Sequence, residues 1–245
     1  MLRSMKEIIG YKLRAFDGEI GKCKDFLFDS KKWAIRYIVA DTGTWLPGRK
    51  VLISPVSLGQ PHWEDRTFPV GLKKTKIESA PGLDHDAPVS RQYEIDFHKY
   101  YGWPYYWKGF HLWGRRTTPW PFYEEGIPAD DEHDESGHDP QLRSFNEVHD
   151  YNVIAKDKKT GIIHDFIVND EDWAISYLVV DIGNWFFGKK VLVAPGFVER
   201  VDYFESEITL SMNSDHIKEF PEYDSHNPVN VEVEAVSYDF KGRPH

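Results

Sequence analysis

The stretch GKCKDFLFDSKKWAIRYIVADTGTWLPGRKVLISPVSL, residues 21–58, decides the fold because it recurs 140 residues later as GIIHDFIVNDEDWAISYLVVDIGNWFFGKKVLVAPGFV, residues 161–198. The two stretches align without a gap and are identical at 16 of 38 positions. Self-similarity at one fixed offset is typical of a duplicated structural unit. The same offset extends weakly outward, from Ser4 and Ser144 to Gly102 and Gly242, so one unit comprises about a hundred residues.

Within each unit, β-branched and aromatic residues in a period of two favour strands over helices. Along residues 33–40 the odd-numbered side chains are all apolar, and on the other face only Arg36 is polar. A strand that is apolar on both faces belongs inside a barrel or beneath a covering layer. Further strands are expected over residues 11–14, 20–28, 50–54 and 66–70.

The predicted fold class is therefore mainly β (α+β), with two tandem small β-barrels, short helices and an aromatic-rich linker. Ser90 is placed to cap a helix that runs to Tyr101 and stops at Gly102. The expected domains are residues 1–104 and 141–245, with residues 105–140 as an aromatic and then acidic linker.

The charge is distributed unevenly along a chain whose net charge is −10. Residues 1–82 carry 15 Lys and Arg against 9 Asp and Glu, residues 141–245 carry 10 against 19, and residues 124–140 add eight carboxylates without Lys or Arg. The acidic total argues against a nucleic-acid partner. Opposite signs predict that the two repeats attract each other within the chain, and the alternative is a basic surface kept for an external partner.

No apolar run reaches the roughly 18 to 20 residues that a membrane helix needs, and residues 1–10 contain no signal-peptide core. We therefore expect a cytoplasmic protein with at most peripheral membrane association. The single cysteine, Cys23, is expected to be a small buried hydrophobe, since its match in the second repeat is Ile163.

Four tryptophans follow the first repeat among Tyr, Phe, Gly and Pro: Trp103, Trp107, Trp113 and Trp120. Large aromatic side chains bury much area, so these rings are expected to cover the first barrel or fill the seam between barrels. The alternative is an exposed interaction surface, because Trp and Tyr anchor interfaces.

The polar residues shared by the repeats suggest turns rather than catalysis. Asp41 and Asp181 end the central strands, where Asp accepts backbone N–H bonds in a turn and Gly43 and Gly183 supply backbone freedom. Gly48 and Gly188 are interpreted as hairpin-turn residues.

Two further acids, Asp25 and Asp165, lie within strands, which suggests a β-bulge or a hydrogen bond to a turn. His133 and His138 lie among acids with no metal-site spacing, and no nucleophile or phosphate-loop motif is found. We therefore predict no catalytic residue, no cofactor and no metal site.

The repeated pattern Gly-x-x-x-Asp-Phe, Trp-Ala-Ile-x-Tyr, Val-x-Asp-x-Gly-x-Trp and Gly-x-Lys-Val-Leu-x-x-Pro resembles the PRC-barrel family, named for the photosynthetic reaction centre H subunit. Residues 84–104 are similar to the tail of stand-alone bacterial members. The resemblance implies two tandem PRC-type β-barrels that serve as interaction modules and carry no catalytic residues.

These expectations favour a non-enzymatic interaction or scaffold module of a bacterial cytoplasm, with an unknown protein partner. One alternative is a peripheral membrane or photosynthetic-complex-associated protein that uses the basic residues 1–82. Another is a ligand-binding protein or enzyme with a pocket between the barrels, lined by the linker aromatics.

Overall fold

The computed structural model describes residues 1–119, 142–183 and 188–225, which form two compact units. Unit 1 contains residues 1–7, 145–170 and the described residues after 174, and unit 2 contains residues 8–144, as far as described, with 171–174. The chain thus passes between the units at four places along its sequence.

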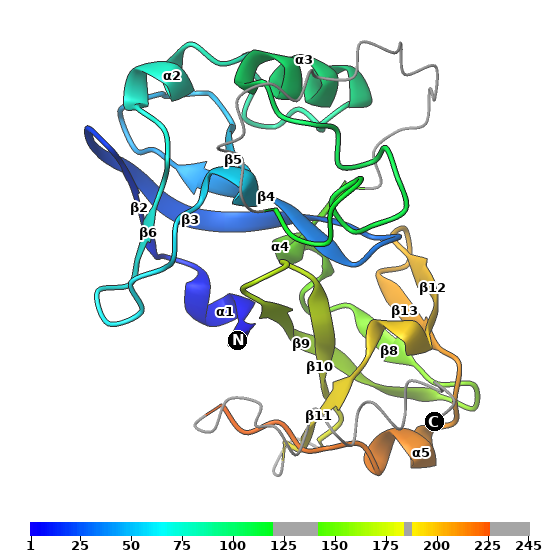
Figure 1. The fold of residues 1–245 in the computed structure, drawn as a ribbon. Helices are drawn as coiled ribbons and strands as arrows, with labels where there is room; N and C mark the ends of the chain where they lie inside the picture. Colours follow the sequence, from blue (N-terminus) through cyan, green and yellow to red (C-terminus); the bar gives the residue numbers. More distant parts are fainter. Residues whose placement is uncertain (120–141, 184–187, 226–245) are drawn as a thin grey trace. The chain divides into compact units, whose positions relative to one another are not determined.

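Unit 2 contains a six-stranded sheet (Figure 1). Its strands are β2 (Lys12–Ala15), β3 (Gly18–Asp29), β4 (Ala34–Asp41), β5 (Val51–Ile53), β6 (Thr67–Pro69) and β7 (Leu142–Ser144). The order is β5-β4-β3-β2-β6, and β7 pairs with β3. The β2–β6 pair is parallel, and the other pairs in this sheet are antiparallel.

Unit 1 contains a seven-stranded sheet with the corresponding strand order, β11-β10-β9-β8-β13-β12, and β1 pairs with β9. Its strands are β1 (Leu2–Ser4), β8 (Asn152–Ile154), β9 (Lys159–Asn169), β10 (Ile175–Asp181), β11 (Lys190–Val193), β12 (Val198–Asp202) and β13 (Glu207–Leu210). Here the parallel pair is β8–β13.

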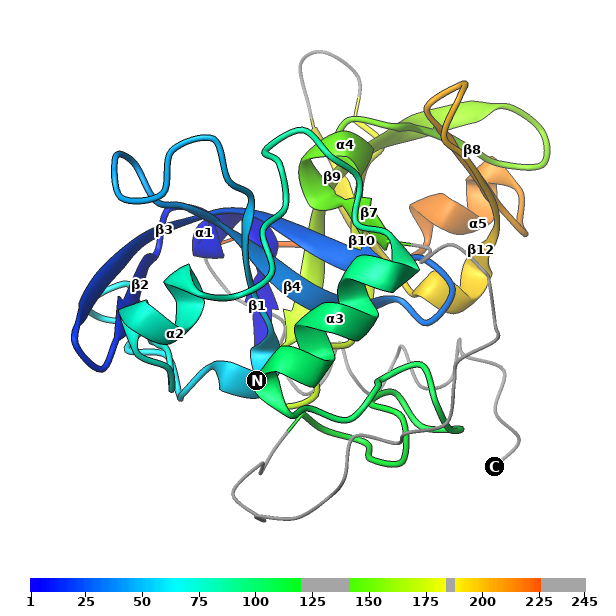
Figure 2. The same ribbon diagram turned by 90° about the horizontal axis from the view of Figure 1, so that it is seen from above.

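The helices are short: α1 (Met5–Ile8), α2 (Lys74–Glu78), α3 (Arg91–Tyr101), α4 (Phe145–Val148) and α5 (Ser214–Lys218). The predicted ends of α3 are confirmed, since the Ser90 hydroxyl accepts the Tyr93 amide at 3.2 Å and Gly102 is left-handed with φ of 70°. Figures 1 and 2 show α2 and α3 over the same side of the unit 2 sheet. None of the helices in the described part of the chain is long and apolar enough to span a membrane.

The mainly β prediction is confirmed, but the prediction of closed barrels is wrong, because both sheets are open and mixed. A 3-10 turn, η1 (Pro55–Ser57), stands between β5 and β6, and η2 (Pro195–Phe197) stands between β11 and β12. Proline has no N–H to donate to a ladder, so each turn interrupts the hydrogen bonding that closure needs. In unit 2, Leu58, the residue after η1, forms an isolated bridge with Val70, the residue after β6.

The core of unit 2 forms on both faces of β4, as its two-sided apolar pattern predicts. From Ala34 to Ile38 every residue is buried, Arg36 included. Helix α3 covers one face, where the rings of Tyr37 and Phe97 meet edge to face with centroids 5.6 Å apart.

In each unit a glycine lies against the last backbone carbonyl of the neighbouring strand, β4 or β10. A Cβ at Gly21 would lie 2.0 Å from the Asp41 carbonyl oxygen, and one at Gly161 would lie 2.3 Å from that of Asp181. Any side chain here would push β3 from β4, or β9 from β10.

We predict that Gly21→Ala lowers the free energy of unfolding by about 2 to 4 kcal/mol, because overpacking against backbone adds to the strain of a φ of +155°. The matched control is Gly10→Ala, where φ is +86° and a Cβ meets no atom within 4 Å, with an expected loss of about 1 kcal/mol. Urea denaturation measures both. Equal losses would contradict the close approach.

Candidate functional site

Two strands with the same sequence, Leu-Arg-Ser, complete the two sheets. In unit 1, Leu2, Arg3 and Ser4 of β1 lie opposite Asn169, Val168 and Ile167 of β9. In unit 2, Leu142, Arg143 and Ser144 of β7 lie opposite Asp29, Phe28 and Leu27 of β3. The register is the same in both, so the first strand of each repeat pairs with the long strand of the other repeat.

A serine–aspartate hydrogen bond fixes each added strand. The Ser4 hydroxyl donates to Asp165, and the Ser144 hydroxyl donates to Asp25. Both acids lie where the pairing register shifts, so of the two alternatives, a β-bulge or a hydrogen bond to a turn, the structure shows the bulge. The other carboxylate oxygen of each acid accepts the next backbone amide at 2.8 Å.

Asp165 is the more enclosed of the two acids, with 2% of its surface exposed, and it also accepts the Lys6 amide at 3.2 Å. Burial raises the pKa of this carboxyl to about 6, while the hydrogen bonds from Ser4 and Lys6 oppose that rise. Strand β1 and the first turn of α1 thus each supply one donor to this buried carboxylate.

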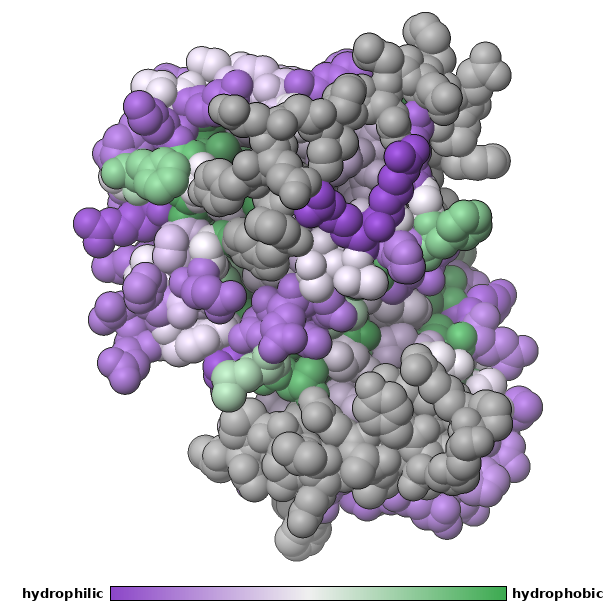
Figure 3. Space-filling model, viewed as in Figure 1, coloured by the Kyte–Doolittle hydropathy of each residue, from purple (hydrophilic) through white to green (hydrophobic). Residues whose placement is uncertain are grey.

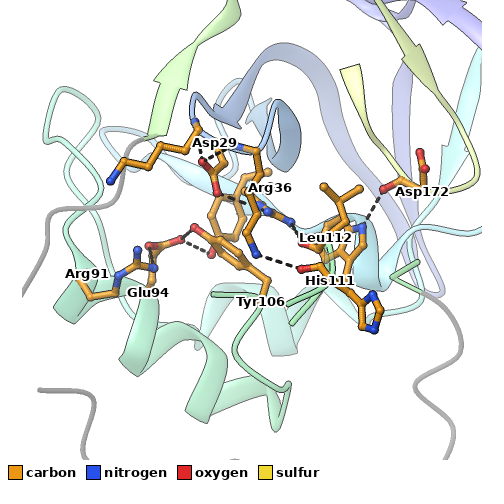
Figure 4. A network of polar contacts seen from close by, with 12 residues as sticks. Asp29, Arg36, Arg91, Glu94, Tyr106, His111, Leu112 and Asp172 are labelled. Atoms are coloured by element: carbon orange, nitrogen blue, oxygen red, sulfur yellow. Dashed lines mark hydrogen bonds and ion pairs between the residues drawn. The ribbon is translucent and has the colours of Figure 1, made fainter. Parts of the chain in front are cut away.

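A second polar arrangement lies inside unit 2 and centres on Arg36, whose side chain is fully buried (Figure 4). Its guanidinium donates to the Leu112 carbonyl at 2.7 Å and lies 3.4 Å from an Asp29 oxygen. It also lies 4.0 Å from the ring centre of Tyr106 and 5.0 Å from that of Trp113. A buried cation needs such carbonyl, carboxylate and ring partners.

Beside Arg36, the carboxylate of Glu94 on α3 accepts three bonds: from the Tyr37 hydroxyl at 2.9 Å, the Tyr106 hydroxyl at 2.7 Å and Arg91 at 2.8 Å. Burial raises the pKa of Glu94 to about 7, against the opposing effect of Arg91. The Tyr37 hydroxyl also lies 3.1 Å from His98 Nε2, and burial lowers the pKa of His98 to about 4.

These contacts fasten the aromatic segment to β4. Trp103 and Trp113 are buried at 8% and 5% exposure, so their rings pack inside unit 2. Trp107 is half-buried with the Arg91 guanidinium 4.1 Å from its ring centre, and Trp120 lies outside the described residues. Glu94 and His98 are buried beneath this layer. Their polar atoms therefore bind other residues of unit 2 and are not exposed to a ligand in solvent.

An open groove of about 1020 Å³ lies elsewhere on unit 2. Strand β2 contributes Lys12 and Arg14, and Phe16 at the β2–β3 turn is 71% exposed. The remaining lining residues are Ala15, Gly18, Glu19, Val56, Ser57, Leu58, Gly59, His62, Asp65, Thr67, Pro69, Val70, Gly71, Leu72 and Trp103. On the molecular face seen in Figure 3, hydrophilic residues predominate and hydrophobic ones form small separate patches.

The predicted turn residues are placed as follows. Asp41 accepts the Gly43 amide at 3.0 Å, and Asp181 accepts the Gly183 amide at 3.0 Å. Gly43 and Gly48 are left-handed, with φ of 57° and 74°, and Gly188 lies beside the Asp181 carboxylate.

The remaining candidate side chains are those of Cys23, His133 and His138. Cys23 is buried, and burial raises the pKa of its thiol. Among the described residues no three His, Cys, Asp or Glu side chains gather as metal ligands, and His133 and His138 lie outside those residues.

Residues 141–216 match the family described as PRC-barrel domain. The resemblance drawn from the sequence motifs is confirmed for this part of the chain. An uncharacterized protein of Deinococcus radiodurans is 35% identical over 79 residues, which are 31% of this chain and 27% of the relative. The chain thus matches about a quarter of that relative's length.

We predict that Glu94→Gln flattens the pH dependence of stability. A carboxyl whose folded pKa is raised to about 7 contributes stability below its unfolded pKa of 4.5 and loses it as pH rises toward 7. The stability of the parent protein relative to the Gln variant should therefore fall by up to about 3 kcal/mol between pH 4.5 and pH 8. Urea denaturation across this range measures the difference.

The control is Asp96→Asn. Asp96 is an exposed acid on the same helix, and its carboxylate accepts a hydrogen bond from the Gln92 side-chain amide. This variant should retain the fall in stability that is assigned to Glu94. If the stability of Glu94→Gln changed with pH in parallel with that of the parent, the pKa of Glu94 would not be raised by folding, and the prediction would be wrong.

Proposed function

We propose that this chain is a non-enzymatic protein-interaction module of the PRC-barrel type, with a second copy of the domain in the part that precedes residues 141–216. The repeat of residues 21–58 at 161–198 supports the second copy. So does the strand order, because β5-β4-β3-β2-β6 and β11-β10-β9-β8-β13 follow the same sequence of strands within their repeats.

The observation that carries the proposal is the addition of a Leu-Arg-Ser strand from each repeat to the sheet of the other. Strand addition is a recurring mode of peptide recognition, in which main-chain hydrogen bonds give affinity and side-chain contacts give specificity. The two repeats thereby bind each other within the chain. This use of strand addition within the chain supports a binding role for the fold.

The groove of unit 2 is the surface we assign to an external protein partner. It combines the exposed ring of Phe16 with the cationic side chains of Lys12 and Arg14, and aromatic and Arg side chains dominate binding energy at interfaces. The described residues of unit 2 carry 19 Lys and Arg against 14 Asp and Glu, while those of unit 1 carry 9 against 15. This charge favours an acidic partner for unit 2.

We predict that Phe16→Ser reduces recovery of the partner about tenfold when the full chain is used as bait in an affinity capture from native cells, read by mass spectrometry. The reason is the loss of an exposed aromatic anchor. The matched control is Phe204→Ser, since Phe204 is 93% exposed at the β12–β13 turn of unit 1.

Equal recovery with both variants and the parent would remove the groove from the proposal. If no protein is recovered by any bait, the interaction function itself fails.

A further inference from the structure

The two strand-binding sites take the same ligand, the tripeptide Leu-Arg-Ser, in the same register. We propose that these sites also accept the Leu-Arg-Ser strand of a second copy of the chain, so that copies pair by exchanging strands between molecules. This inference rests on the proposed function, because it uses the strand addition that joins the repeats within one chain.

The site in unit 1 shows what the ligand must carry. Leu2 packs against a buried apolar cluster formed by Ile167, Tyr177, Val179, Leu192 and Ala194. The Arg3 Nε lies 3.6 Å from an Asp170 oxygen, and the Ser4 hydroxyl donates to Asp165. The ligand is therefore an extended segment with an apolar, a cationic and a hydroxyl side chain in that order.

Strand β7 carries the same three side chains and is bound in unit 2 by the matching ladder and the matching bond to Asp25. One feature differs, since the position of Asp170 is occupied by Ser30 in the first repeat. The site in unit 1 therefore includes an acid for the strand arginine at a position where the first repeat has a serine. The strand of any second copy meets each of its three requirements.

Pairing within one chain and pairing between chains make the same contacts, so concentration decides between them. A tethered strand acts at an effective concentration on the order of millimolar. In dilute protein, each Leu-Arg-Ser strand should therefore bind the site within its own chain. Refolding at millimolar protein concentration should produce dimers, because each strand then meets the sites of other chains as often as the site of its own chain.

Disulfide trapping tests the proposal on the full chain. Leu2 and Asn169 are directly opposed and half-buried, and facing residues of an antiparallel pair lie within disulfide range. One variant carries Leu2→Cys, a second carries Asn169→Cys with an affinity tag, and a third carries both. The first two are denatured together, refolded at about 1 µM and at about 1 mM, and oxidised.

We expect the double variant to form its disulfide within the chain at 1 µM. The mixed variants should form a covalent dimer at 1 mM, at least about tenfold more than at 1 µM. The control replaces Asn169→Cys by Glu199→Cys, an exposed position on β12, and should give no concentration-dependent dimer with Leu2→Cys.

The outcomes separate the two proposals. A double variant that closes, with mixed variants that never join, would overturn exchange between copies and leave the proposed function standing. A double variant that does not close would overturn the strand addition on which both rest. Equal dimer with Glu199→Cys would mean random collision and would also overturn the inference.

Discussion

The hydrogen bond between a strand serine and a bulged aspartate is the interaction on which the rest of the structure depends. A β-bulge removes a ladder partner, and a buried carboxylate left without donors costs several kcal/mol. Asp165 and Asp25 each meet this demand with one backbone amide of their own strand and one serine hydroxyl of an added strand. At each bulge the added strand contributes a hydroxyl donor at the position of the carboxylate.

In unit 2, the aromatic segment that follows α3 packs over strand β4 because of Arg36. In unit 2 the buried Arg36 requires carbonyl, carboxylate and ring partners, and the aromatic segment after α3 supplies most of them. The matching residue of the second repeat is Ser176, which has no such requirement. Within unit 2, the partners that Arg36 requires account for the position of the Tyr106 and Trp113 rings beside its guanidinium.

Local patterns predicted local structure well. The two-sided apolar pattern of residues 33–40, the helix ends at Ser90 and Gly102 and the bulge at Asp25 are all present, because each depends on residues close in sequence. The closed barrels were predicted wrongly, although Pro55 and Pro195 already marked the places where the ladders stop. Within the buried polar network, the sequence marks Arg36 as the one polar residue of an apolar strand. No sequence pattern marks Glu94 and His98 as buried, because they lie among the aromatic residues of a predicted helix.

The exchange of strands could not be predicted from sequence. Ser4 and Ser144 stand at the same place in two similar repeats, so the sequence is equally compatible with each strand pairing in its own repeat. The choice depends on how the chain passes between units, which is a property of the whole fold. It also determines which sheet edge each strand covers, and so which surface remains for a partner.

The most direct test is to measure cross-strand nuclear Overhauser effects in isotopically labelled protein under dilute conditions. The exchange predicts contacts between the backbone protons of Arg3 and Val168 and between those of Arg143 and Phe28. Contacts of Arg3 with Phe28 and of Arg143 with Val168 would mean that each strand stays in its own repeat, and would contradict the account.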